Sequence, residues 1–336
     1  MSSDRSKLTI QTTSYAHLNA GIVIIGAGMA GSRFAIELAR ARQQSQSSNN
    51  QRSLPIILIS KEPEVGYNRI MLSPVLAGDS AFDDTYLYQQ SDYEQLGIIV
   101  LAGTAVTAVD TKQQSIELDS GQTLVYAKLV IATGSSARVI PFPNHDATGV
   151  HVFREVADVN ALIEYANQGK KGLVIGGGVL GLEAACALAS QGADMTVVHV
   201  DSYVLNRQLD LPAAQLLQAE LARRGVAVEV SAITDCIMVN DQHEVAGLSL
   251  KDGRILPANF IVMAVGVMPN IALARDCGLE VNRGILVDNF MHTSCPHVYA
   301  VGECVELDGA LFGMVAPVNQ QVDALVSVLK DTRLSG

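Results

Sequence analysis

Two short apolar runs along the chain are each followed by a cluster of glycines and then by apolar positions three or four residues apart. Residues 21–31 read GIVIIGAGMAG and residues 172–181 read GLVIGGGVLG. A β-branched run of this length predicts a buried strand, and the spacing that follows it predicts a helix. The pattern therefore predicts two strand–turn–helix units, whose helices would carry apolar positions at Phe34, Ala35, Leu38 and Ala39 in the first and Leu182, Ala185, Leu188 and Ala189 in the second.

The similarity between the two copies continues downstream. A polar turn at residues 119–122 lies between alternating apolar positions, which predicts a hairpin, and the apolar run 129–134 follows it. Residues 251–254 and 260–266 repeat this order in the second copy. The polar stretch 43–52, which belongs to the first copy, is expected to be a loop. The chain thus predicts an α/β protein with two related nucleotide-binding domains.

Both glycine clusters fit the pattern G-x-G-x-x-G, with Gly26, Gly28 and Gly31 in the first copy. In a strand–turn–helix unit, the first glycine allows the tight turn and the second lets the backbone approach a pyrophosphate. The third lets the helix pack against the strand. The N–H groups at the start of the helix would bind the phosphates. One such motif is weak evidence, but two copies in the same context predict two dinucleotide sites, the second at Gly176, Gly178 and Gly181.

An acidic residue at the end of the second strand of each copy would bind a ribose hydroxyl. In the first copy Lys61 and Glu62 follow this strand, and Glu62 is the candidate acid. In the second copy the strand ends at His199, which is expected to cover the adenosine edge, and Asp201 comes two residues later. No arginine pair follows to bind a 2′-phosphate, so the pattern favours NADH and leaves NADPH open.

Composition excludes several other classes of protein. The chain has 336 residues, 49% hydrophobic and 17% charged, which excludes a disordered protein. Its net charge of −11 argues against a nucleic-acid partner, which needs a basic face. The five cysteines include no C-x-x-C pair and lie at no metal-ligand spacing, so reduced thiols and no metal site are expected. Residues 1–20 lack the apolar core of a signal peptide and no run is long enough to span a bilayer, so a cytoplasmic protein with no membrane partner is expected.

These motifs, together with others along the chain, resemble those of the pyridine nucleotide–disulfide oxidoreductase superfamily. Within it, the chain is most similar to the FAD-containing N-terminal part of assimilatory NAD(P)H-nitrite reductase large subunits, followed by rubredoxin and ferredoxin reductases. The resemblance extends over residues 21–330. Besides the glycine motifs, it is carried by residues 62–73, Ala132-Thr133-Gly134, residues 176–183, 266–269 and 299–304, and Val315-Ala316-Pro317.

The resemblance implies that the first copy binds FAD. The first glycine motif would hold the pyrophosphate, and Gly302-Glu303 would contact the ribityl–phosphate region, with Glu303 where Asp is more usual. Arg69 and Ser73 would lie near the flavin. The cofactor-binding residues expected in the first copy and the C-terminal segment are Gly26, Gly28, Met29, Ala30, Gly31, Lys61, Glu62, Arg69, Ser73, Val106, Ala132, Thr133, Gly134, Gly302, Glu303, Val315, Ala316 and Pro317, of which Ala316 and Pro317 would lie against the isoalloxazine ring.

The same resemblance implies that the second copy binds NAD(P)H. Glu183 would face the nicotinamide and is the catalytic candidate. The cofactor-binding residues expected in this copy are Gly176, Gly178, Val179, Leu180, Gly181, His199 and Gly266.

The chain departs from this superfamily in three ways. Residues 67–77, where disulfide reductases carry a redox cysteine pair, contain no cysteine, so electrons are not expected to leave through a dithiol there. Pro74 stands where rubredoxin and ferredoxin reductases often have a lysine that pairs with the residue equivalent to Glu183. The chain ends at Gly336, so the C-terminal interface domain of the family, and the iron–sulfur and sirohaem segments of nitrite reductases, are expected to be absent.

We therefore expect two Rossmann-like three-layer (ββα) domains: a discontinuous FAD-binding domain of residues 1–150 and 285–336, and an NAD(P)H-binding domain of residues 151–284. The expected function is electron transfer from NADH through FAD to a separate redox partner. That partner would be an iron–sulfur, sirohaem or molybdenum enzyme of nitrite or nitrate assimilation, or a rubredoxin-like protein. A stand-alone NADH oxidase or peroxidase, and a non-catalytic flavin- and NAD(H)-binding protein, remain alternatives.

Overall fold

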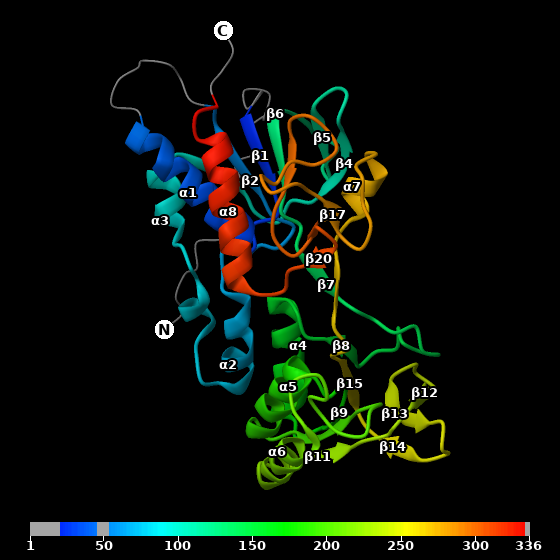
Figure 1. Ribbon diagram of the computed structural model, residues 1–336. Helices are drawn as coiled ribbons and strands as arrows, with labels where there is room; N and C mark the ends of the chain where they lie inside the picture. Colours follow the sequence, from blue (N-terminus) through cyan, green and yellow to red (C-terminus); the bar gives the residue numbers. More distant parts are fainter. Residues whose placement is uncertain (1–20, 46–53, 333–336) are drawn as a thin grey trace. The chain divides into compact units, whose positions relative to one another are not determined.

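The apolar runs that precede the two glycine motifs form central strands of two parallel sheets (Figure 1). The structure, a computed structural model, describes residues 21–45 and 54–332. These residues divide into two units. The first consists of the described parts of Met1–Asn68, Tyr86–Ser135 and Pro269–Gly336, and the second consists of Arg69–Thr85 and Ser136–Met268.

The first unit contains a parallel sheet with the strand order β3-β2-β1-β6-β18. Strand β6 continues beyond this sheet into an antiparallel meander with β5 and β4. The elements of this unit are β1 (Gly21–Ile25), α1 (Met29–Ser45), β2 (Ile56–Ile59), α3 (Gln90–Gln95), β3 (Ile98–Leu101), β4 (Val106–Asp110), β5 (Ser115–Leu118), β6 (Thr123–Ile131), α7 (Ala272–Asp276), β17 (Ile285–Leu286), β18 (Val298–Ala300), β19 (Val305–Leu307), β20 (Ala310–Leu311) and α8 (Val315–Leu329).

The side chains of β1 alternate between two cores, as the pleat of a strand requires. Ile22 and Ile24 pack in one core with α1 and α8, whereas Val23 and Ile25 pack in the other core with the meander. Helices α1 and α8, the blue and red helices of Figure 1, are in contact on their face of the sheet. The unit is therefore a stack of three layers: helices, parallel sheet and meander.

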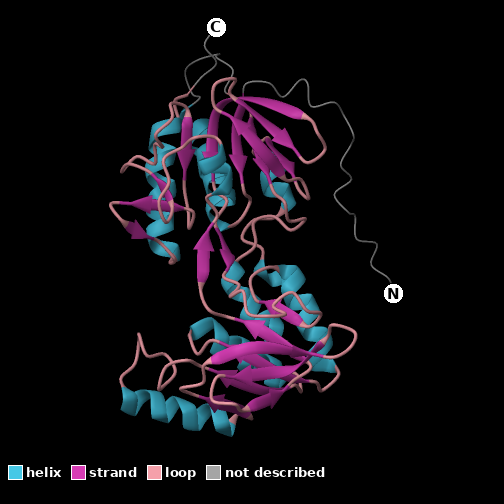
Figure 2. Ribbon diagram, turned by 90° about the vertical axis from the view of Figure 1, so that its right-hand side faces the viewer, coloured by secondary structure: helices cyan, strands magenta, loops and turns pink. Residues whose placement is uncertain are grey.

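The second unit repeats this architecture. Its parallel sheet has the order β11-β10-β9-β15-β8, and a separate meander is formed by β12, β13 and β14 (strands in magenta in Figure 2). Leu173 and Ile175 of β9 pack in one core with Ile237 and Leu248 of the meander. The elements are β8 (Val150–Val152), α4 (Val156–Asn167), β9 (Lys171–Ile175), α5 (Val179–Ser190), β10 (Asp194–Val198), α6 (Leu211–Arg223), β11 (Val226–Glu229), β12 (Thr234–Val239), β13 (Val245–Leu250), β14 (Ile255–Pro257) and β15 (Phe260–Met263).

The chain order of the fifth strand differs between the two sheets. In the second unit β8 precedes the glycine motif, whereas in the first unit β18 comes from beyond the whole second unit. The chain therefore returns to complete the first sheet, which makes the first unit discontinuous. Strands β7 (Ser135–Ala137) and β16 (Val267–Pro269), where the chain passes between the units, pair with each other.

The boundaries of the units differ from the expected ends at residues 150 and 285. Residues 136–149 belong to the second unit because the Asn144 side chain donates to the Ile237 carbonyl and the Ile237 N–H donates to the Pro143 carbonyl. Residues 269–284 belong to the first unit because α7 packs against β4 and Leu279 lies in the meander core. These contacts join residues distant in sequence, so the repeat does not reveal them.

Residues 69–85 also belong to the second unit, although the expected boundaries placed them in the first. This segment includes the 3-10 turns Arg69–Met71 and Phe82–Thr85 and the helix α2 (Leu72–Ala77). Helix α2 packs against α4 and α5. The Gln191 side chain donates to the carbonyl of Ala77, the last residue of α2, and the guanidinium of Arg69, in the turn before α2, donates to the Arg154 carbonyl. Hydrogen bonds thus hold the segment on both sides of the helix.

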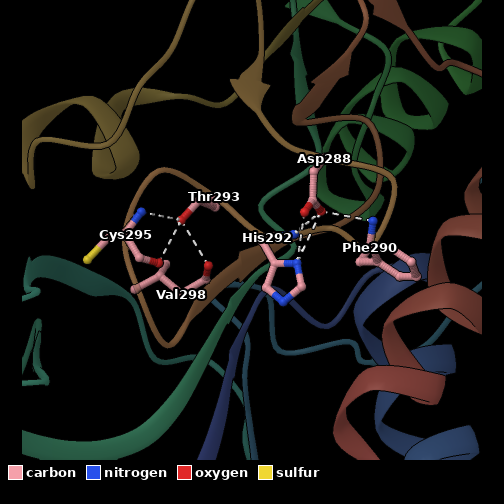
Figure 3. Close-up of polar contacts among 6 residues, drawn as sticks. All are labelled: Asp288, Phe290, His292, Thr293, Cys295 and Val298. Carbon is pink, nitrogen blue, oxygen red and sulfur yellow. Dashed lines mark hydrogen bonds and ion pairs between the residues drawn. The ribbon is translucent and has the colours of Figure 1, made fainter.

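The outer edge of β18 is covered by the loop that precedes it. The Ala300 N–H donates to the Met291 carbonyl, and the Asp288 carboxylate accepts from the His292 N–H and lies 3.0 Å from the His292 Nδ1 (Figure 3). The Thr293 hydroxyl donates to the Val298 carbonyl at the same edge. The hydrogen bonds of these polar side chains hold the loop over the edge of the sheet, so we assign them a structural role.

The predicted elements agree with this fold at several points. The two hairpin turns at residues 119–122 and 251–254 connect β5 to β6 and β13 to β14, and both predicted helices are present. Within the expected loop 43–52, α1 continues to Ser45, and residues 46–53 lie outside the described part. The N-terminal stretch 1–20 lies outside it as well. Among the described residues, no helix combines the length and the apolar character needed to cross a membrane.

Candidate functional site

Only glycine fits at two positions where β1 leads into α1, one in the turn and one in the first turn of the helix. Gly26 has φ +107°, and a Cβ there would lie 2.2 Å from the Ala132 carbonyl oxygen. A Cβ on Gly31 would lie 1.9 Å from the Gly26 carbonyl oxygen. Gly28 differs, because a Cβ there would meet nothing within 4 Å. The backbone is therefore tightly packed at Gly26 and Gly31 and open at Gly28, the glycine expected to approach a pyrophosphate.

The turn between β9 and α5 has the same geometry. Gly176 has φ +122°, with the Ala264 carbonyl oxygen 2.3 Å from the position of a Cβ, and a Cβ on Gly181 would lie 2.1 Å from the Gly176 carbonyl oxygen. A Cβ on Gly178 would again meet nothing within 4 Å.

In both units this open space lies at the start of a helix, whose first N–H groups have no partner within the helix and carry partial positive charge. Met29 and Ala30 form the partly exposed first turn of α1 beside Gly28. Val179 and Leu180 form the first turn of α5 and are 51% and 37% exposed. Both turns thus fit the pyrophosphate of a dinucleotide.

The second motif of the first unit reaches the first glycine turn. A Cβ on Gly302, which has φ +96°, would lie 3.0 Å from the Ala30 Cβ, so the two backbones are close. The Gly302 N–H donates to the buried Gln321 Oε1 at 2.8 Å, and the Ser135 hydroxyl donates to Glu303 Oε2 at 2.8 Å. These bonds fix Gly302 and Glu303 next to the start of α1, and neither Gln321 nor Ser135 is part of a sequence motif.

The start of α8 supplies the other C-terminal residues of the expected site. Val315, Ala316 and Pro317 form its first turn; the first two are exposed and Pro317 is partly exposed. Gly313 lies just before them, and a Cβ there would be 3.9 Å from Glu303 Oε1. The three residues therefore share a surface of the first unit with the second motif.

Thr133 and Gly134 are held by a residue that the sequence did not single out. The Asn270 side chain donates to the Thr133 carbonyl at 2.8 Å, and the Thr133 hydroxyl donates to the Asn270 carbonyl at 2.9 Å. The Asn270 N–H donates to the Gly134 carbonyl at 2.9 Å. Ala132 precedes this pair and forms the floor of the Gly26 turn. Asn270 is thus an anchor for the turn, and its only sequence signal is its place after Pro269.

The end of β2 places the expected acid in a defined position. Glu62 Oε2 accepts from the Tyr67 hydroxyl at 2.7 Å, whereas Lys61 beside it is exposed. Val106 begins β4 and packs, partly buried, against the meander core; its contact with the cofactor stays a prediction.

In the second unit, His199 lies beneath the glycine turn. It follows β10 and is 8% exposed, and its Nδ1 accepts from the Gly177 N–H at 3.1 Å. Asp201 takes the position that Glu62 takes in the first unit. Its Oδ2 accepts from the Asn206 side chain at 2.9 Å.

The catalytic candidate of the second unit has a partner on α2. Glu183, an exposed residue of α5, accepts from the Ser73 hydroxyl at 2.8 Å. Ser73 thus provides a hydrogen bond to the carboxylate, where Pro74 has taken the place of the expected lysine. Arg69 and Ser73, expected beside the flavin of the first copy, both make their described contacts in the second unit. Gly266, with φ +101°, follows β15 at the same edge of the sheet as Gly176.

The thiol nearest to the second motif is buried. Cys304 is 0% exposed, and its Sγ lies 3.3 Å from the Val301 carbonyl oxygen. Burial raises the pKa of this thiol, so it stays protonated at neutral pH. Its surroundings are those of a packing residue.

A family model and similar proteins of known name agree on one family for this chain. The family described as "Pyridine nucleotide-disulphide oxidoreductase" matches residues 20–323. The chain is 42% identical over 306 residues to the assimilatory nitrate reductase electron transfer subunit of Bacillus subtilis, a match that covers 91% of this chain and 38% of that protein. It is 30% identical over 315 residues to the rubredoxin-NAD(+) reductase of Acinetobacter baylyi, with 92% and 78% covered.

A solved structure agrees with this result. The covalent putidaredoxin reductase–putidaredoxin complex is similar with a TM-score of 0.81 and 26% sequence identity, over 95% of this chain and 77% of that chain. The chain spans less than two fifths of the length of the curated nitrate and nitrite reductases that it matches.

Proposed function

Because the chain belongs to the pyridine nucleotide-disulphide oxidoreductase family, we propose that it oxidises NADH through bound FAD and passes the electrons to a separate redox protein. The observation that carries this proposal is the duplicated glycine turn, with open space at Gly28 in one unit and at Gly178 in the other. Two dinucleotide sites in one chain suit a reaction between two dinucleotides.

FAD is assigned to the first unit. The backbone at Gly28, Met29 and Ala30 would bind its pyrophosphate, and Glu62 would bind the adenosine ribose. Support comes from the closeness of Gly302 to Ala30, which places Glu303 next to this turn. When bound, FAD supplies the ability to accept a hydride and to release its electrons one at a time.

NAD(P)H is assigned to the second unit. The backbone at Gly178, Val179 and Leu180 would bind its pyrophosphate, and the Glu183 carboxylate would orient the nicotinamide end. The Ser73 hydroxyl supports this role, because it fixes one Glu183 oxygen at 2.8 Å. Asp201, three residues after the end of β10, favours NADH over NADPH, since a carboxylate there repels a 2′-phosphate.

The electron acceptor is proposed to be a protein with an iron–sulfur, sirohaem or molybdenum centre, or a rubredoxin-like protein. Three similar proteins support a protein acceptor: an assimilatory nitrate reductase electron transfer subunit, a rubredoxin-NAD(+) reductase, and a putidaredoxin reductase in covalent complex with putidaredoxin. A thiol route lacks support, because residues 67–77 contain no cysteine and Cys304 is buried.

The test is steady-state oxidation of NADH by the purified holoprotein with two acceptors. We expect rapid reduction of ferricyanide, a one-electron acceptor, and slow uptake of oxygen. Fast oxygen uptake with no gain from ferricyanide would instead assign a stand-alone oxidase. Binding of NADH without turnover to either acceptor would assign a non-catalytic protein.

A further inference from the structure

The two units have the same backbone but different side chains at one position beneath the glycine turn. Ser60 follows β2 and His199 follows β10. Each donates its N–H to a carbonyl of the next strand, Leu101 in the first unit and Glu229 in the second, at 2.9 and 2.8 Å. Ser60 and His199 are therefore equivalent positions in the two copies, and so are the turn residues that face them.

The turn residue and the strand-end residue change size together. In the first unit the turn carries Ala27, which is 3% exposed, and the strand-end residue is the small Ser60, which is 5% exposed. In the second unit the turn carries Gly177 opposite the large His199. A Cβ on Gly177 would lie 2.8 Å from the His199 Cγ and 3.0 Å from the Val204 Cγ1. The glycine is thus required by the imidazole that packs beneath it.

The imidazole also makes a polar contact that a serine would not replace in this position. The Gly177 N–H donates to His199 Nδ1 at 3.1 Å, and the Leu205 N–H donates to the Gly177 carbonyl at 2.9 Å. Because Nδ1 accepts, the proton of the neutral ring is on Nε2, which is buried and makes no hydrogen bond to the described residues; Asp201 Oδ2 lies 3.6 Å from it. His199 thus holds the buried amide of the turn and directs its own N–H towards Asp201.

We propose that His199 is a positioning residue for the dinucleotide of the second unit, acting through Gly177. This inference rests on the proposed function, which assigns NAD(H) to that unit. The neutral imidazole fixes the Gly177 amide, and the turn then presents Gly178 and the start of α5 to the pyrophosphate. Protonation of Nδ1 would set two N–H donors against each other at 3.1 Å, so the bound form requires the neutral ring.

This role predicts that dinucleotide binding weakens on acidification. Histidine ordinarily changes its charge between about pH 5 and 8. The charged group described near the ring is the Asp201 carboxylate, on the loop after β10, with Oδ2 3.6 Å from His199 Nε2. Glu229, whose backbone carbonyl accepts from the His199 N–H, has its carboxylate paired with Arg254 at 2.6 Å.

The test measures the affinity of the purified holoprotein for NAD⁺, which is stable in acid, by calorimetry from about pH 5.5 to about pH 8. We expect binding to be about tenfold weaker at the acid end for the wild type. His199→Asn places a non-titrating acceptor near the position of Nδ1, so its affinity should stay within about threefold of the wild-type value at pH 8 and show no pH dependence. His199→Leu has no acceptor and should bind weakly at every pH.

A double variant reproduces the pair found in the first unit. Gly177→Ala with His199→Ser removes the clash with the imidazole and should fold, as judged by thermal unfolding, but it should bind NAD⁺ weakly at every pH because serine does not replace the Nδ1 acceptor. Gly177→Ala alone should be destabilised and lose binding. A wild-type affinity that does not change with pH, or a pH dependence retained in His199→Asn, would overturn the inference even if His199→Leu fails to fold. Absence of both NAD⁺ binding and flavin reduction by NADH would overturn the proposed function instead.

Discussion

Gly28 and Gly178 are equivalent residues that differ only in the unit to which they belong. Neither has a positive φ, and a Cβ on either meets open space, so alanine fits both positions without strain. Gly28→Ala should fold normally but lower the FAD content of the purified protein about tenfold, because the Cβ occupies the place of the pyrophosphate. Gly178→Ala should keep its FAD and weaken NADH binding about tenfold.

Each of these variants is the control for the other, since the same atom is added in both. Flavin absorbance per chain and calorimetric titration with NAD⁺ measure the two effects. An exchange of the phenotypes would mean that the cofactors are assigned to the wrong units.

The Ser73 hydroxyl is the described partner of the Glu183 carboxylate. Ser73→Ala should slow the reduction of the flavin by NADH about threefold, a modest effect because this hydrogen bond is exposed to solvent. Ser73→Thr keeps the hydroxyl and should restore the rate. Rapid mixing under anaerobic conditions measures both variants, and equal rates in all three proteins would show that Ser73 does not act on Glu183.

Cys304 lies next to the second motif but is packed in the core with a raised pKa. Cys304→Ser keeps the size of the side chain and a donor for the Val301 carbonyl. Turnover with ferricyanide should therefore remain within about twofold of the wild type. A large loss of turnover in a variant with unchanged thermal unfolding would implicate the thiol in the reaction.

At the level of residues, sequence reasoning identifies groups whose role depends on the backbone and misses groups whose role depends on distant partners. Gly26 and Gly176 can be identified from the sequence, because a positive φ and a carbonyl oxygen close to the position of a Cβ allow only glycine there. The role of Asn270 cannot be predicted from the sequence, because its hydrogen-bond partner Thr133 is 137 residues away along the chain. Gln321 and Ser135 are missed for the same reason, since their bonds to Gly302 and Glu303 form only in the folded chain.

The turn that follows β6 depends on one side chain from the returning segment. Asn270→Ala removes the donor to the Thr133 carbonyl and leaves that part-buried carbonyl without it. The cost should be about 1–2 kcal/mol, which lowers the midpoint of thermal unfolding by about 2–4 °C in a protein of this size. Asn270→Asp keeps the shape without the donor and should be destabilised at least as much. Unchanged midpoints in both variants would contradict the role of this anchor.

Among the elements, the strands and helices next to the glycines are predictable because their apolar spacing is strong. The placement of α2 is not predictable, because its sequence follows the first copy while its packing partners are α4 and α5. The end of β10 shows a related limit. The sequence reveals a histidine at the end of this strand, but only the structure shows that its Nδ1 accepts from Gly177.

For the whole molecule, the internal duplication explains why the sequence predicts two similar units but not where the chain passes from one unit to the other. Each copy forms a parallel sheet, a meander and a glycine turn with the same close contacts. The fifth strand breaks the symmetry, since β18 returns from the far end of the chain whereas β8 comes before its own glycine motif. The repeat therefore predicts two units, but the points where the chain passes between them follow from long-range packing.

The central claim is that one chain carries FAD in its first unit and receives a hydride from NADH bound in its second. Anaerobic addition of NADH to the purified holoprotein tests it most directly, with the loss of the flavin's visible absorbance as the signal. We predict stoichiometric bleaching in the wild type, bleaching at the same limiting rate but only at higher NADH concentration in Gly178→Ala, and return of the colour on addition of ferricyanide. A flavin that NADH does not bleach, or a wild-type protein that is purified folded and without flavin, would contradict the account.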